Sequence, residues 1–279
     1  MKLNHPLFFG SLLGLAVLAV GSPAQAWGDG FHHARANGTT QRSGTYQSLH
    51  NGSGTFNSTV NRQPGSASGN TTWTNANGGQ GSHSFDNTWS STGNGSGTGT
   101  HQSSTTYANG KTSSSQGTVN QTSSGNFTYS GTRTGANGDV TDVSKTSTTS
   151  DGTRTVAATY DNTTTGKTTT VDKTYSTNTN GSRQVDSTVT GPNGKTTTSD
   201  QTFTKDSNGY VQTGTVTGPN GGTSSDTRAV SYTQDTNGQV TRTMSGSVTG
   251  PNGKTEQIGN SETYTKTYTP NSDPNPGQD

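Results

Sequence analysis

The sequence predicts an all-β fold built from repeated β-hairpins of about 28 residues. Two observations support this fold class. Turn signals return at a nearly constant spacing, and the residues between them are mostly Thr, Val, Tyr and Phe, which favour strands. Helices are not expected, because Ala and Leu are scarce and Gly or Pro interrupts the chain too often.

The repeat is visible in two interleaved series of glycines, most of which follow Asn. The steps within them are 27 to 32 residues, so a turn signal arrives about every 14 residues. The first series is Gly110, Gly138, Gly166, Gly194, Gly221 and Gly253, and the second is Gly125, Gly152, Gly181, Gly209 and Gly238.

The most regular copies contain Gly-Pro-Asn-Gly, as in TVTGPNGKT at 188–196. Pro fixes φ at the first central position of a type I turn, so this tetrapeptide predicts such a turn. Plain Asn-Gly pairs are the preferred two-residue hairpin loops. Each repeat is therefore expected to read turn, strand, turn, strand.

The hairpin at Asn208-Gly209 allows the faces of one copy to be predicted. A two-residue loop there would pair Ser207 with Tyr210 and place Phe203, Tyr210 and Val216 on one face. Alternate threonines would carpet the other face. The same rule applied at 180–181 and 237–238 separates aromatic residues from valines, so some turns must have three residues or a bulge.

Two architectures fit this pattern, an antiparallel meander and a β-solenoid. A single sheet that is wet on both faces has little to stabilise it, so we expect stacking of faces or association between chains. A largely disordered secreted protein remains an alternative, because the hydrophobic residues make up only 20%.

The chain is expected to divide into five segments. Residues 1–26 have the charged start, apolar run and Ala-Gln-Ala site of a secretory signal peptide. The others are an irregular Gly/Asn/Ser-rich segment (27–76), a degenerate repeat (77–108), the Thr-rich hairpin repeats (109–269) and a disordered Pro-rich tail (270–279). The protein is expected to be secreted or at the cell surface, with a periplasmic location possible.

Charge and composition exclude several classes of function. Removal of Lys2 with the signal peptide lowers the formal net charge from +1 to zero. We therefore expect no nucleic-acid partner, which would require a basic patch. We also expect no membrane insertion after signal removal, because alternate strand positions are Thr and Ser rather than apolar.

Candidate metal sites are few. His32-His33, with Asp29 nearby, could bind copper or zinc, but we interpret these residues as a solvated, flexible chain start. The segments 206–209 and 235–238 resemble the opening of a calcium loop but lack its distal Glu, so they are interpreted as turns. We predict no metal site and no cofactor.

We predict that the protein is not an enzyme. No His follows His101, so the regular repeats lack the usual general base, and carboxylate pairs such as Asp139 and Asp142 fit solvated turns. No catalytic or cofactor-binding residue is therefore predicted. The sequon at Asn126 is expected from composition alone.

Two binding roles remain open. Trp73, Trp89, Tyr107 and Tyr129 could stack on sugars, or could serve only as anchors of a thin core. Regular Thr-x-Thr arrays on a flat face could bind an ice surface; examples are Thr188/Thr190, Thr215/Thr217 and Thr263/Thr265.

The TGPNGKT copies at about 109–269 resemble a Thr/Gly-rich repeat of small secreted bacterial proteins. In general design the chain also resembles curli-type amyloid subunits, although its period is longer and regular Gln/Asn ladder positions are absent. The resemblance implies a structural protein of the cell surface or extracellular matrix that self-associates into fibres or acts as an adhesin. A surface polysaccharide is a possible partner.

Overall fold

The computed structural model describes residues 37–48, 52–93 and 95–270, which form sixteen antiparallel β-strands. In chain order they are β1(Gly38–Ser48), β2(Gly52–Gln63), β3(Ser66–Asn75), β4(Gln80–Gly93), β5(Ser96–Thr106), β6(Thr112–Ser123), β7(Asn126–Thr134), β8(Val140–Ser150), β9(Thr153–Asn162), β10(Lys167–Thr177), β11(Arg183–Thr190), β12(Thr196–Asp206), β13(Gly209–Thr217), β14(Thr223–Gln234), β15(Gln239–Thr249) and β16(Thr255–Pro270). Among the described residues, no helix is both long and apolar enough to span a membrane. The predicted signal peptide (1–26), residues 271–279 of the predicted tail (270–279) and His32-His33 lie outside the described residues.

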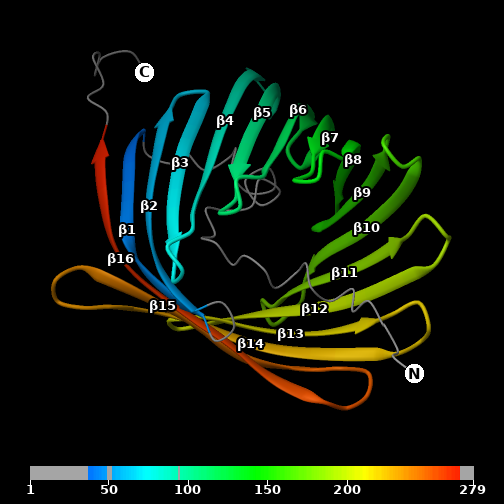
Figure 1. Ribbon diagram of the computed structural model, residues 1–279. Helices are drawn as coiled ribbons and strands as arrows, with labels where there is room; N and C mark the ends of the chain where they lie inside the picture. Colours follow the sequence, from blue (N-terminus) through cyan, green and yellow to red (C-terminus); the bar gives the residue numbers. More distant parts are fainter. Residues whose placement is uncertain (1–36, 49–51, 94, 271–279) are drawn as a thin grey trace. The chain divides into compact units, whose positions relative to one another are not determined.

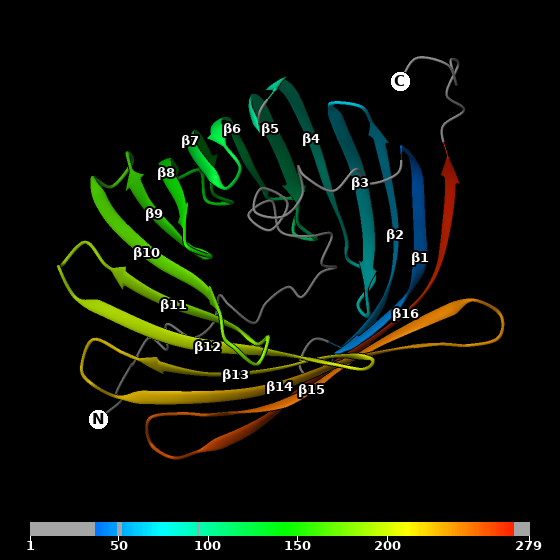
Figure 2. The same ribbon diagram turned by 180° about the vertical axis from the view of Figure 1, so that it is seen from behind.

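The strands follow one another around a closed barrel (Figure 1, and from behind in Figure 2). Each strand pairs with the next in the chain, and β1 pairs with β16 from Gly38↔Pro270 to Ser48↔Asn260. The predicted all-β hairpin repeat is confirmed, whereas the solenoid and the open meander are wrong. A sheet of this many twisted strands can curl until its two edges meet, which satisfies backbone groups that an open sheet would leave unpaired.

The repeated Gly-Pro-Asn-Gly segments form three-residue hairpin loops. Between β11 and β12, the amide of Gly194 donates to the carbonyl of Gly191 (2.9 Å), and the amide of Gly191 donates to Lys195 (2.9 Å). This geometry is the predicted type I turn, followed by a glycine with a φ of 73°. Asn193 thus closes the type I turn, and Gly194 supplies the left-handed residue after it.

The predicted faces are correct although the predicted pairing is not. In the hairpin of β12 and β13, Lys205 pairs with Tyr210 and Asp206 with Gly209, so Ser207 and Asn208 form the loop. The register differs from the prediction by two residues, and a shift of two leaves every side chain on its predicted face. The expected three-residue turn occurs between β10 and β11, where the amide of Asn178 donates to Ser182 (2.8 Å).

The buried apolar side chains all lie on one face of the sheet. They are Phe56, Val60, Trp73, Val119, Val143, Ala158, Val230, Ile258 and Tyr264. Large rings on this face lie over glycines of the adjacent strand: a Cβ at Gly81 would collide with the indole of Trp73, and one at Gly69 with Phe85. Glycine thus provides the space in which a large ring can pack flat against the sheet.

Candidate binding faces

Alternation along the strands divides the side chains of the sheet into two chemically different faces. One, which we call the ring face, carries every aromatic side chain that the structure describes in a strand. They are Tyr46, Phe56, Trp73, Phe85, Trp89, Phe127, Tyr129, Tyr160, Tyr175, Phe203, Tyr210, Tyr232 and Tyr264. The opposite face, the hydroxyl face, consists mainly of Ser and Thr with some Asn, Gln and Asp.

Charge is divided between the two faces in the same way. Every Lys and Arg that the structure describes within a strand lies on the ring face; they are Arg42, Arg62, Arg133, Lys145, Arg154, Lys167, Lys173, Arg183, Lys205, Arg228, Arg242 and Lys266. The hydroxyl face carries Asp86, Asp142, Asp161, Asp172, Asp186, Asp200 and Asp206. A formal net charge near zero therefore conceals a basic face and an acidic face.

On β7 to β10, cations and rings of the ring face contact one another. The Lys145 ammonium lies 5.4 Å from the ring centre of Tyr129 and 5.9 Å from that of Tyr160. The Arg154 guanidinium lies 5.3 Å from the ring centre of Phe127 and 5.6 Å from that of Tyr175. Such cation–π contacts contribute about 0.5–1 kcal/mol at exposed sites and more where water is excluded.

The side chains of this region converge above the sheet. Phe127 and Tyr175 lie on strands separated by two others, yet both rings contact the same Arg154 guanidinium. Burial lowers the pKa of Lys145, and repulsion from Arg133 and Lys173 lowers it further. The ring face thus holds several cations close together despite their mutual repulsion.

His101 lies next to this cluster and is almost fully buried, with 3% of its surface exposed. Its Nδ1 lies 2.6 Å from the side-chain oxygen of Asn87, and its Nε2 lies 3.1 Å from the hydroxyl of Ser115. Burial lowers its pKa, and the charges of His83 and Lys145 lower it further. A neutral imidazole that donates to Asn87 and accepts from Ser115 fits these contacts.

The ring face of β13 to β16 has a different character, because it carries acids as well as cations. Asp226 lies 2.9 Å from Arg228 as an ion pair without hydrogen-bond geometry. Glu262 lies opposite Arg242 on the adjacent strand. Burial raises the pKa of Glu262, and the positive charges of Arg242 and Arg42 partly offset this rise. Tyr232 is the most exposed large ring of the described chain, with 42% of its surface accessible.

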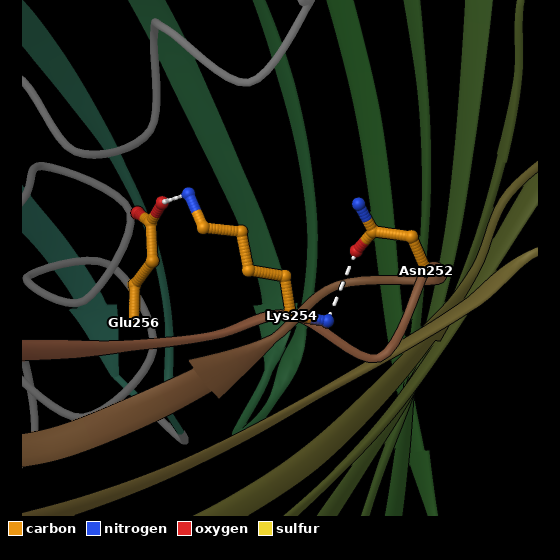
Figure 3. A network of polar contacts seen from close by, with 3 residues as sticks. All are labelled: Asn252, Lys254 and Glu256. Atoms are coloured by element: carbon orange, nitrogen blue, oxygen red, sulfur yellow. Dashed lines mark hydrogen bonds and ion pairs between the residues drawn. The ribbon is translucent and has the colours of Figure 1, made fainter.

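The β15–β16 hairpin adds an exposed ion pair close to its turn. The Lys254 ammonium lies 3.0 Å from a carboxylate oxygen of Glu256, and the Lys254 amide donates to the side-chain oxygen of Asn252 (3.1 Å) (Figure 3). Both charged side chains are largely exposed, so the pair contributes little to stability. Lys254 in this turn therefore already has a carboxylate, that of Glu256, beside its ammonium group.

The hydroxyl face is hollowed over β8 to β13 into a groove of about 670 Å³. Threonines dominate its lining, and its charged lining residues are Asp172, Lys173, Asp186 and Asp200. Asp186 and Asp200 are directly opposite each other, and the Gln184 amide donates to both, at 3.1 Å and 3.2 Å. In the described part of the chain, no group of three or more His, Cys, Asp or Glu side chains is placed to hold a metal ion.

The structure distributes the predicted sugar-stacking residues as follows. Trp73, Trp89 and Tyr129 lie on the ring face, on β3, β4 and β7, and Trp73 is buried. Tyr107 lies in the turn after β5, with its hydroxyl 3.1 Å from that of Ser113. The structure therefore does not gather these four residues into one site.

The remaining predicted candidates lie in turns or on the hydroxyl face. The carboxylate of Asp206 accepts from the Ser207 amide (2.6 Å), and that of Asp235 accepts from two amides of its own turn. Asp139 lies in a turn and Asp142 on the hydroxyl face of β8. The Thr-x-Thr arrays also lie on the hydroxyl face: Thr188/Thr190, Thr215/Thr217 and Thr263/Thr265. Sequence reasoning missed the cations of the ring face, because only the register reveals that they share it.

Comparison with known proteins assigns the chain to no family. A scan of protein-family models finds no match, and a search of curated proteins finds none either. The function proposed below therefore rests on the chemistry of the two faces.

Proposed function

We propose that this chain is an exported, non-enzymatic protein of the cell surface or extracellular matrix that binds polysaccharide through its ring face. The observation that carries the proposal is the confinement of all described strand rings and cations to one side of the sheet. Packing alone does not require lysines and arginines to share a face with aromatic rings. The combination suits a polysaccharide-binding surface, because aromatic rings stack on sugar rings while cations and amides bond to their polar substituents.

Tyr232 provides the sharpest test of this function. Its ring is exposed, so truncation should remove a stacking surface with little effect on folding. We expect the secreted chain to bind a neutral glucan or polygalacturonate in affinity electrophoresis. Tyr232→Ala should weaken that binding about three- to tenfold, the value of one aromatic contact.

Thr233→Ala is the matched control, because Thr233 follows Tyr232 on β14 but lies on the hydroxyl face. It should bind as the parent chain does. The proposal fails if neither polysaccharide binds, or if the two variants bind equally well.

Self-association remains a separate prediction, but the barrel changes its physical basis. The sequence argument rested on unpaired strand edges that template another copy. Each described strand has a partner on both sides. Association between intact barrels would therefore have to use faces or turns, and sedimentation velocity of the purified chain would detect it.

A further inference from the structure

The ring face of β7 to β12 carries cations without any acid. The register sets Arg133, Lys145, Arg154, Lys173, Arg183 and Lys205 on successive strands in an oblique row across the sheet. All residues of these six strands are described, and none of their Asp or Glu side chains lies on the ring face. We call this group the basic row. On β13 to β16, by contrast, the ring face carries acidic side chains as well as cations.

Holding the basic row together has an energetic cost. Lys145 is partly buried between two tyrosine rings, and Arg133 and Lys173 repel its charge. The carboxylates of the same strands lie across the sheet, on the hydroxyl face. Like charges gathered on one surface are favourable mainly when an anion binds there.

The geometry favours a linear anion over a compact one. The row crosses six strands that lie about 4.8 Å apart, so a single phosphate or carboxylate could meet only part of it. A polymer that follows the oblique row, rather than lying straight across the strands, would meet a cation on each strand. Ammonium and guanidinium groups bond carboxylates and sulfates with charge-assisted hydrogen bonds.

The rings of the region favour a sugar polymer over a nucleic acid. Lys145 and Arg154 already lie over Tyr129, Tyr160, Phe127 and Tyr175. Bases need open ring faces on which to stack. A uronate chain can bind the cationic groups of this region through its carboxylates, without the ring stacking proposed for exposed rings such as Tyr232.

We infer that the basic row binds acidic, carboxylate-bearing polysaccharide, which would be the preferred ligand of the ring face. This inference rests on the proposed function and narrows it to one class of polymer. It also explains how a chain with a formal net charge of only +1 can select a polyanion. The carboxylates of β7 to β12 lie on the other side of the sheet.

The test measures binding of the full secreted chain to polygalacturonate, a neutral dextran and a single-stranded oligonucleotide at low salt. We expect polygalacturonate to bind most tightly and to weaken as salt is added. Lys145→Met should weaken polygalacturonate binding about tenfold, as expected for one charge-assisted contact. Lys173→Met should act in the same direction.

Lys195→Met is the matched control, because Lys195 lies in the turn after β11 and loses the same charge outside the basic row. It should change binding less than about twofold. Thermal melts serve as the folding control. Lys145→Met removes a repelled, partly buried charge but also the contacts of that charge with Tyr129 and Tyr160, so its melting temperature should stay close to that of the parent chain.

Three results would overturn the inference. If dextran binds as tightly as polygalacturonate, the polysaccharide function stands but the acidic preference is wrong. If the oligonucleotide binds most tightly, the basic row is a nucleic-acid surface instead. If no polysaccharide binds, the inference fails together with the proposed function.

Discussion

At the scale of single residues, the ring face uses polar groups where a conventional core would use aliphatic ones. His101, Ser58, Thr71 and Ser147 are buried there beside valines and rings. They are satisfied by their neighbours, as in the hydrogen bond from Thr71 to Ser58 (2.9 Å). A chain with few apolar residues thus obtains a packed face from small hydroxyls, glycines and a few large rings.

His101 makes the stability of the barrel dependent on pH. Its pKa in the folded chain lies below the ordinary value of 6.5, because burial, His83 and Lys145 disfavour the charged form. The unfolded chain therefore binds the proton first as the pH falls. The associated stability is present above about pH 6.5 and is lost as the pH falls through the folded pKa.

We therefore expect the free energy of unfolding, measured in urea, to be lower at pH 5 than at pH 7.5. His101→Gln retains hydrogen bonding without the titration and should show a smaller drop. The contribution of carboxylates that titrate in the same pH range is common to both chains, so it cancels in the comparison. An identical drop in both would show that His101 does not contribute.

At the scale of elements, the pairing of rings with glycines on the next strand determines how each hairpin packs. Trp73 on β3 lies over its partner Gly81 on β4, and Trp89 lies against Gly97 and Gly99 on β5. Val, Thr and Phe explain why these segments are strands. The glycines explain how rings can lie flat between them.

Gly81→Val should therefore destabilise the protein although valine favours strands. The new side chain would collide with the Trp73 indole, and overpacking of this kind costs about 1–3 kcal/mol. Urea unfolding followed by tryptophan fluorescence measures the loss. The control Ser82→Val, on the hydroxyl face of the same strand, should stay within about 0.5 kcal/mol of the parent chain. Equal losses in the two variants would contradict the packing account.

The hairpin was predictable from sequence, whereas the closure of the sheet was not. Asn-Gly and Gly-Pro-Asn-Gly predict local turns. Alternation along the strands predicted Phe203, Tyr210 and Val216 on one face, and the structure confirms this. Pairing of β1 with β16 joins residues more than 200 positions apart. No local pattern encodes that contact, so meander and solenoid fitted the sequence as well as a barrel did.

The candidate site was predictable only in part for the same reason. Trp89 and Tyr129 could be named as stacking residues from their chemistry alone. The basic row could not, because Lys145 and Arg154 share a face only once the two-residue loop between β8 and β9 fixes their register. The net charge of the whole chain does not reveal the basic row, because the cations of the ring face and the carboxylates of the hydroxyl face nearly cancel in the sum.

At the scale of the whole molecule, closure changes what the protein can do. The pairing of β1 with β16 leaves no described strand with an open edge, and it gives both faces of the sheet a continuous surface. Rings and cations lie on one surface, and hydroxyls and most strand carboxylates on the other. This separation of chemistry is the basis of the proposed function, and it follows from the register between neighbouring strands, which the pairing of β1 with β16 continues around the barrel.

Closure can be measured directly, because the chain has no cysteine of its own. Ser43 on β1 pairs with Thr265 on β16, and both lie on the hydroxyl face. Ser43→Cys combined with Thr265→Cys should form a disulfide within the monomer on mild oxidation, since paired residues of adjacent strands lie within bridging distance. In the control, Ser43→Cys is combined with Gln239→Cys, one strand further on β15, which is too far to bridge. A closed barrel predicts an oxidised monomer for the first pair alone. Disulfides that form only between molecules, or not at all, would contradict it.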